Sequence, residues 1–228
     1  MNRRPVIETI QQALAGPLPG MKGQIKMAPQ PRSDQVNRWE IPDNYREAGV
    51  LLLLYPHHQP NQLEPELHVV LTRRPDYPGT HGGQISLPGG RREGDESLLV
   101  TALREAQEEI GLDPAAVEVI GQLSPLYIPP SNFYIYPFIA YSSVRPAFQP
   151  DAKEVAELIE APLHLLFNPA IQREEIWQFP NYGERRVPFF DVFGHRVWGA
   201  TAMILSEFLT LLQPNGTAVG SDNLTVSA

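Results

Sequence analysis

The chain has 228 residues, of which 42% are hydrophobic and 19% charged, and its formal net charge is −8. This length and composition predict a globular protein with one well-buried domain and residues left over for arms. An acidic chain without a Lys/Arg cluster is a poor partner for nucleic acids or anionic membranes, and the absence of cysteine excludes disulfides and thiolate metal sites.

The two ends of the chain differ in composition from its centre. Residues 5–14 place apolar side chains on one face of a short amphipathic helix, and residues 15–35 are rich in Pro, Gly and Gln, which predicts an extended connection. Residues 214–228 are small and polar, which predicts a mobile tail. We therefore expect an N-terminal arm over residues 1–35, one domain over residues 36–213 and a C-terminal tail.

Between these ends, apolar runs and turn residues predict a mixture of strands and helices. The segments with strand-like patterns are 48–55, 66–74, 84–87, 117–123 and 132–141. The segments with helical patterns are 95–110, 154–167 with an interruption near Pro162, and 201–212. Residues 184–199 predict a hairpin that turns near Gly194. Because strands and helices mix without regular βαβ alternation, we expect the α/β class (α+β), with layers around a mixed sheet.

The first of these helices carries an unusual concentration of acids. Asp95 is its expected N-cap, and Gly111 stands where a left-handed residue ends a helix. Glu105 and Glu109 lie about 40° apart beside an apolar face, with Glu108 on the flank, because successive helical residues turn by about 100°. Like charges at these spacings cost roughly 0.2–0.5 kcal/mol per pair. We expect Glu109 to face solvent or a bound ion rather than the core.

Two interpretations of the acidic helix compete. A run of charges is usually a solvated helix face. Against that, Arg104 is the only nearby cation, and no Lys follows an acid at the helical spacing of four. Gly89 and Gly90 can also bring backbone carbonyls close to the start of the helix. Clustered carboxylates with a carbonyl form an all-oxygen site, which favours Mg²⁺ or Mn²⁺.

The spacing of these residues resembles the complete Nudix box. Gly90 is followed after five residues by Glu96 and, after seven more, by REAQEEIG over residues 104–111. Seven fixed positions at fixed spacing make a chance match far rarer than about one in a million, given residue frequencies of roughly 5–7% each. The resemblance implies a Nudix-type α/β/α sandwich around a mixed β-sheet. It also implies a metal-dependent hydrolase of nucleoside diphosphates linked to another moiety.

The resemblance assigns roles to the matching positions. It implies that Glu105, Glu108 and Glu109 are metal ligands, and that the Gly90 carbonyl is a further ligand. Arg104 would orient the glutamates, and Glu96 would support the loop before the helix. Glu154 is a further acid after the box that could assist the metal or act as the base; the alternative is an ordinary glutamate at the start of a helix.

The stretch before the box resembles the coenzyme A pyrophosphatase-type subgroup of the Nudix proteins. The matching segment is LTRRPDYPGTHGGQISLPGG over residues 71–90, and weaker likeness extends over roughly residues 45–212. This chain departs from the subgroup at Pro75, at Leu87 and at Gly79, where the subgroup carries an arginine. The resemblance implies cleavage of CoA or its thioesters at the pyrophosphate, giving adenosine 3′,5′-bisphosphate and a 4′-phosphopantetheine species. The alternatives are ADP-ribose, NADH or dinucleoside polyphosphates as substrates and, last, a catalytically silent Nudix-fold binding module.

Four residues outside the box are candidates for substrate binding. Arg74 and His81 could face phosphates; a strand-end salt bridge and a loop histidine bonded to backbone are the alternatives. Gln84 and Ser86 alternate with Ile85 and Leu87 in a short strand, so one of the two pairs faces the core. Phe133 could stack on an adenine or pack in the core. We thus expect a nucleotide as the partner, with no nucleic acid and no membrane, and the family's habit allows a homodimer. No signal-peptide core follows Arg3 and Arg4, so we expect a cytoplasmic location.

Overall fold

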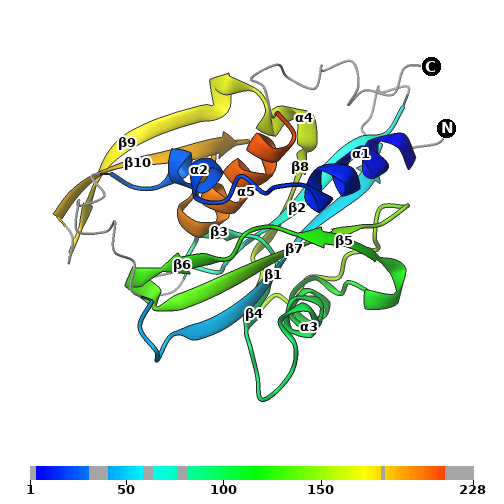
Figure 1. Ribbon diagram of the computed structural model, residues 1–228, viewed down its shortest axis with the longest axis horizontal. Helices are drawn as coiled ribbons and strands as arrows, with labels where there is room; N and C mark the ends of the chain where they lie inside the picture. The colour runs from blue at the N-terminus through cyan, green and yellow to red at the C-terminus, as the bar shows by residue number, and fades with distance from the viewer. Residues whose placement is uncertain (1–3, 31–40, 59–63, 77–81, 181–182, 214–228) are drawn as a thin grey trace.

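The protein is described from a computed structural model that places residues 4–30, 41–58, 64–76, 82–180 and 183–213 (Figure 1). None of the helices in these ranges is both long enough and apolar enough to cross a membrane. Residues 214–228 and His81 lie outside the described residues, as do residues 31–40. The boundaries expected for the arm, the domain and the tail therefore stay predictions.

An eight-stranded mixed sheet forms the centre of the fold (Figure 1). Its strands are β1 (Arg46–His57), β2 (Glu66–Arg73), β3 (Ile85–Ser86), β4 (Gly89–Arg91), β5 (Glu118–Gln122), β6 (Leu126–Ile128), β7 (Phe133–Tyr141) and β8 (Glu157–Pro162). The main order is β3-β2-β1-β7-β5, while β4 pairs with β1, β6 with β7 and β8 with β2. The long central strands β1 and β7 are parallel, and the other pairs are antiparallel. The sheet is therefore mixed, as expected.

Helices and a second sheet cover the two faces. The helices are α1 (Arg4–Ala15), α2 (Met21–Gln24), α3 (Leu98–Ile110), α4 (Leu163–Leu166) and α5 (Gly199–Leu211). Short 3₁₀ turns are η1 (Ile25–Met27), η3 (Pro114–Ala116), η4 (Pro129–Ser131) and η5 (Pro169–Ile171). The second sheet has the order β11-β10-β9, made of β9 (Gln172–Phe179), β10 (Gly183–Val192) and β11 (His195–Trp198).

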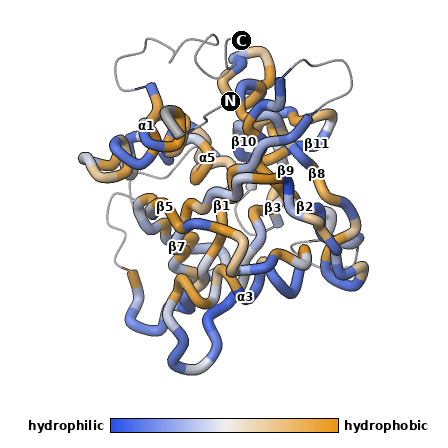
Figure 2. The backbone as a smooth tube through the Cα atoms, turned by 90° about the vertical axis from the view of Figure 1, so that its right-hand side faces the viewer, coloured by the Kyte–Doolittle hydropathy of each residue, from blue (hydrophilic) through white to orange (hydrophobic). Residues whose placement is uncertain are grey.

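Strand β1 separates two hydrophobic clusters, because its side chains alternate between the faces of the sheet. Leu51 and Leu53 pack in the cluster under α3, whereas Leu52 and Leu54 pack in the larger cluster under α5. Figures 1 and 2 show α3 on one side of the sheet, with α5 and the second sheet on the other. The expected α/β class with layers around a mixed sheet is thus confirmed.

Helix α3 sits close to the sheet because small residues meet at the contact. Ala102 and Ala106 are fully buried on its inner face, and Gly49 of β1 lies beneath them. A Cβ atom at Gly49 would stand 2.9 Å from the Ala102 nitrogen, so only glycine permits this approach. Gly111 ends the helix at φ 68°, as expected. The N-cap, however, is Ser97 rather than Asp95, and its hydroxyl accepts from the Val100 nitrogen.

Most expected elements are present, but two of the expected segments differ in the structure. The predicted hairpin over 184–199 is formed by β10 and β11, and the closing helix is α5. The helix expected over 154–167 is instead strand β8 followed by the four-residue α4. Pairing with the free edge of β2 overrides the helical pattern there, and Pro162 ends the strand. The connection expected over 15–35 is also not fully extended, because it contains α2 and η1.

Candidate active site

The acids of the box gather at one end of the sheet because four elements meet there. Helix α3 carries Glu105, Glu108 and Glu109, and β4 passes beneath it with Gly90. Arg74 follows the last residue of β2, and the exposed turn before β8 carries Glu154. The structure therefore brings most of the residues predicted from the sequence into one region.

Glu109 is a buried acid, so of the two expected alternatives the solvent-facing one is wrong and the bound ion stays a prediction. Its exposed fraction is 3%. One carboxylate oxygen accepts a hydrogen bond of 3.0 Å from the Gly89 nitrogen, and the other lies 3.9 Å from Nη2 of Arg74. Burial raises the pKa of Glu109 to about 7, although the Gly89 N–H and Arg74 oppose the shift. The backbone of Gly89, where β4 begins, lies against the helix at this point, which helical periodicity alone does not reveal.

Glu105 explains why position 90 is a glycine. A Cβ atom at Gly90 would overlap the Glu105 carboxyl group. Glu105 is half-buried and lies 2.9 Å from Nη1 of Arg104. Burial raises the pKa of Glu105, Arg104 opposes the shift, and the nearby charges of Glu108 and Glu154 raise it again. The backbone of Gly90 and this carboxylate are thus in direct proximity.

Arg104 links several carboxylates, as the resemblance implies for this position. Its guanidinium lies 2.9 Å from oxygens of Glu96, Glu105 and Glu108, and Nη2 also donates to the carbonyl of Arg91. Hydrogen bonds from Arg104 lower the pKa of Glu96 to about 2. Glu96 also accepts from the backbone of Glu93, which braces the loop before α3.

Glu154 belongs to the same electrostatic environment, although it does not begin a helix. Its nitrogen donates to the Asp151 carbonyl in a turn. Its charge contributes to the raised pKa of both Glu105 and Glu109, so it lies within electrostatic range of the cluster. The alternative of a glutamate at a helix start is therefore wrong.

The region carries more negative than positive charge. Glu96, Glu105, Glu108, Glu109 and Glu154 make five carboxyl groups, whereas Arg74 and Arg104 supply two guanidinium groups. No three acid or histidine side chains among the described residues already converge as metal ligands. The donor set nevertheless fits Mg²⁺ or Mn²⁺, because it consists of carboxylates and a carbonyl, and the excess charge includes a buried acid.

The predicted substrate-binding residues have different surroundings. The Arg74 nitrogen donates to the carbonyl of Gln84, so both belong to the loop beside Glu109. Phe133 is covered by the guanidinium of Arg46, whose central carbon lies 4.1 Å from the ring centroid. His81 lies outside the described residues.

Several contributors were missed by the sequence analysis. Thr101 is buried, and its hydroxyl donates to Glu96 over 2.9 Å. Arg92 pairs with Glu47 over 2.6 Å. A single glycine, Gly49, inside the apolar run AGVLLLL was the available signal for the close approach of α3.

Comparisons with known proteins agree with this geometry. The sequence profile of the NUDIX domain matches residues 46–180. The chain is 34% identical to Nudix hydrolase 22, chloroplastic, of Arabidopsis thaliana over 73% of this chain and 55% of the plant protein. It is 31% identical to the uncharacterized Nudix hydrolase NudL of Yersinia pestis (strain Pestoides F) over 76% of this chain and 90% of that protein. A MutT/nudix family protein from Enterococcus faecalis shares the fold, with a TM-score of 0.50 over 94% of this chain and 75% of that one, at 13% identity.

Proposed function

The chain belongs to the Nudix family of pyrophosphohydrolases, and we propose that it cleaves the pyrophosphate bridge of coenzyme A or its thioesters. The products would be adenosine 3′,5′-bisphosphate and a 4′-phosphopantetheine species. One observation carries the proposal: Arg74, from the segment that resembles the coenzyme A subgroup, reaches within 3.9 Å of Glu109 in the acidic cluster. The segment over residues 71–90, which resembles the coenzyme A subgroup, thus adjoins the glutamates that are proposed to bind the metal.

The proposed metal site uses residues of α3 and β4. Glu105, Glu108 and Glu109, together with the Gly90 carbonyl, would hold Mg²⁺ or Mn²⁺. When bound, the ion supplies neutralisation of phosphate charge and a water of lowered pKa. Arg104 holds Glu105 and Glu108 in place through contacts of 2.9 Å.

The proton and the phosphates require further groups. Glu154 and Glu109 are the candidates for the base that accepts the proton of the attacking water, and a base with a pKa close to the working pH is effective. Arg74 suits contact with phosphate oxygens, because its guanidinium is half-exposed and only loosely paired with Glu109. Gln84, Phe133 and His81 are proposed to contact the rest of the substrate.

A second substrate class is favoured by one observation. Gly79 stands where the coenzyme A subgroup carries an arginine, and a missing cation favours a less charged substrate such as ADP-ribose or NADH. A dinucleoside polyphosphate is the remaining alternative. A silent binding module is disfavoured, because every acid of the box is present. The cytoplasmic location and the homodimer stay predictions.

Hydrolysis measurements decide between these substrates. Purified protein is incubated with Mg²⁺ or Mn²⁺ and CoA, dephospho-CoA, ADP-ribose, NADH or diadenosine polyphosphates, and the products are separated by chromatography. We expect the highest kcat/KM with CoA. If ADP-ribose is the best substrate, the coenzyme A assignment fails while the Nudix assignment stands.

A further inference from the structure

Most arginines in the described part of the chain are already paired with an acid. Those with a carboxylate oxygen within salt-bridge distance are Arg73, Arg74, Arg92, Arg104, Arg145, Arg173, Arg186 and Arg196. Among described side chains, Arg46, Arg91 and Arg185 have no such partner. Arg46 and Arg91 are exposed, so these two guanidinium groups are available to an anionic ligand.

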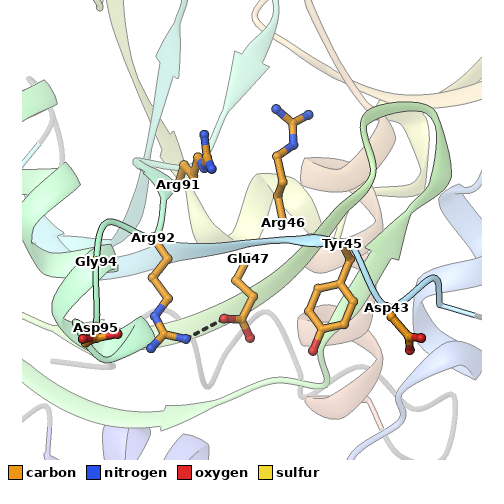
Figure 3. A pocket seen from close by; sticks show the side chains of 8 residues that line it. All are labelled: Asp43, Tyr45, Arg46, Glu47, Arg91, Arg92, Gly94 and Asp95. Atoms are coloured by element: carbon orange, nitrogen blue, oxygen red, sulfur yellow. Dashed lines mark hydrogen bonds and ion pairs between the residues drawn. The ribbon is translucent and has the colours of Figure 1, made fainter.

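The sheet brings Arg46 and Arg91 together. Ala48 pairs with Arg91 across the antiparallel strands β1 and β4, and Arg46 lies two residues before Ala48. Arg46 and Arg91 are therefore diagonal neighbours on one face, where such positions are about 7–8 Å apart. Figure 3 shows both side chains projecting to the same side of β1, while Arg92 and Glu47 project to the other side. Because this spacing describes the backbone and arginine side chains are long and flexible, a single phosphate group is within reach of both side chains.

The surroundings hold one of the two arginines in position. Arg46 stacks on the ring of Phe133, 4.1 Å from its centroid, and it also donates to the Ser131 carbonyl. A stacked guanidinium loses less freedom when it binds an anion. Both arginines line an open surface hollow of about 420 Å³ at the start of β1, whose lining also includes Asp43, Glu47 and Asp95 (Figure 3). This space is large enough for part of a nucleotide.

The same strand connects the arginine pair to the acidic cluster. Arg91 directly follows Gly90, and the Arg91 carbonyl accepts a hydrogen bond of 3.2 Å from Arg104. The outer edge of β4 faces α3, since the Gly89 nitrogen donates to Glu109 and the Arg91 carbonyl accepts from Arg104. A ligand with its pyrophosphate at Gly90 is therefore one residue along β4 from Arg91. Arg74, in contrast, has a carboxylate within 3.9 Å, that of Glu109.

We propose that Arg46 and Arg91 form a subsite for the ribose phosphate that distinguishes CoA from dephospho-CoA. This inference rests on the proposed function, because it names the residues that recognise one part of that substrate. A phosphate monoester offers several acceptor oxygens and a charge near −2, which two arginines can bind through charge-assisted hydrogen bonds. These bonds would exist in the complex with CoA and be absent with dephospho-CoA.

The test compares two substrates and two nucleotides in four proteins. The proteins are the wild type, Arg46→Ala, Arg91→Ala and the matched control Arg185→Ala, which removes another arginine without a carboxylate partner. The kcat/KM values for CoA and dephospho-CoA are measured with Mg²⁺. Binding of adenosine 3′,5′-bisphosphate and AMP is measured by calorimetry in excess chelator, so that this second readout needs no catalysis. Melting temperatures verify that each variant folds.

We expect the wild type to prefer CoA over dephospho-CoA, and each of the two substitutions to lower that preference about tenfold, as for one charge-assisted bond. The preference for the bisphosphate over AMP should fall in parallel, and Arg185→Ala should change neither ratio. If these ratios are unchanged in Arg46→Ala and Arg91→Ala, the subsite proposal is wrong, while the proposed hydrolysis of CoA still stands. If the wild type hydrolyses neither coenzyme, the proposed function fails, and the calorimetric ratio alone decides whether the phosphate subsite exists.

Discussion

Glu109 in the acidic cluster and Glu207 in α5 are both buried glutamates, but their surroundings differ. Glu207 has an exposed fraction of 0%, and its carboxylate accepts from the backbone nitrogens of Gly20 and Ser124 and from the Gln24 side chain, at 2.8–3.1 Å. Glu109 accepts one backbone hydrogen bond and faces other acids. A buried carboxylate with a full set of donors stabilises a fold, whereas one that lacks donors and lies among like charges indicates a functional site.

The largest effect is expected from Glu109→Gln. The amide oxygen can still accept from the Gly89 nitrogen, but the proposed metal loses a charged ligand. Turnover should fall at least about 100-fold, since even partners outside the ligand set cost 10–100-fold. The melting temperature should stay the same or rise, because a buried charge among like charges is removed. Steady-state kinetics and thermal unfolding measure the two quantities; near-native kcat in a well-folded variant contradicts the role of Glu109.

Removal of divalent ions should abolish turnover of the wild type. Excess chelator leaves the carboxylates of α3 without the ion that neutralises them, and added Mg²⁺ or Mn²⁺ should restore activity. The ion should also raise the melting temperature of the wild type, because a ligand that binds only the folded state stabilises it. The ion should raise the melting temperature of the Glu109→Gln variant by a smaller amount. Full activity in chelator would refute the metal site.

Glu207→Ala should have the opposite profile to Glu109→Gln. It leaves the donors of Gly20, Ser124 and Gln24 unpaired in the interior, which costs about 1–3 kcal/mol for each group that water cannot reach. Denaturant unfolding should show this loss, while kcat of the folded enzyme stays close to the wild-type value. A loss of kcat without a loss of stability would remove the distinction between the two glutamates.

The smallest effect concerns Glu160. It is half-buried, so its surroundings are intermediate between those of Glu109 and Glu207. Burial raises the pKa of Glu160. Hydrogen bonds from Arg145 and Tyr55 together lower this pKa by a larger amount, so the net shift is downward. A lowered pKa adds stability above the unfolded value near 4.3, and this stability is lost as the pH falls through the folded pKa. The loss should stay below about 1 kcal/mol, because the Arg145 side chain is partly exposed. Unfolding free energies between about pH 5 and pH 3 should fall more in the wild type than in Arg145→Met.

The box could be predicted from the sequence because its residues are close together in the chain and their spacing is fixed. The burial of Glu109 could not be predicted in this way, since it depends on the backbone at the start of β4, twenty residues earlier, which lies against the helix. The strand character of residues 157–162 likewise depends on the free edge of β2. The lack of acidic partners for Arg46 and Arg91 is a property of the folded surface, and no local pattern reveals it.

The hydrogen bonds of Glu207 have a consequence for synthesis on the ribosome. Gly20 and Glu207 are separated by 187 residues, so the N-terminal segment emerges long before its partner in α5 exists. Contacts of such sequence separation form late and slow folding. Until α5 has been made, residues 20–24 must keep their polar groups in water, and the larger hydrophobic cluster lacks the buried side chains that α5 contributes. The nascent chain is therefore expected to depend on chaperones until α5 emerges, since exposed apolar surface favours aggregation.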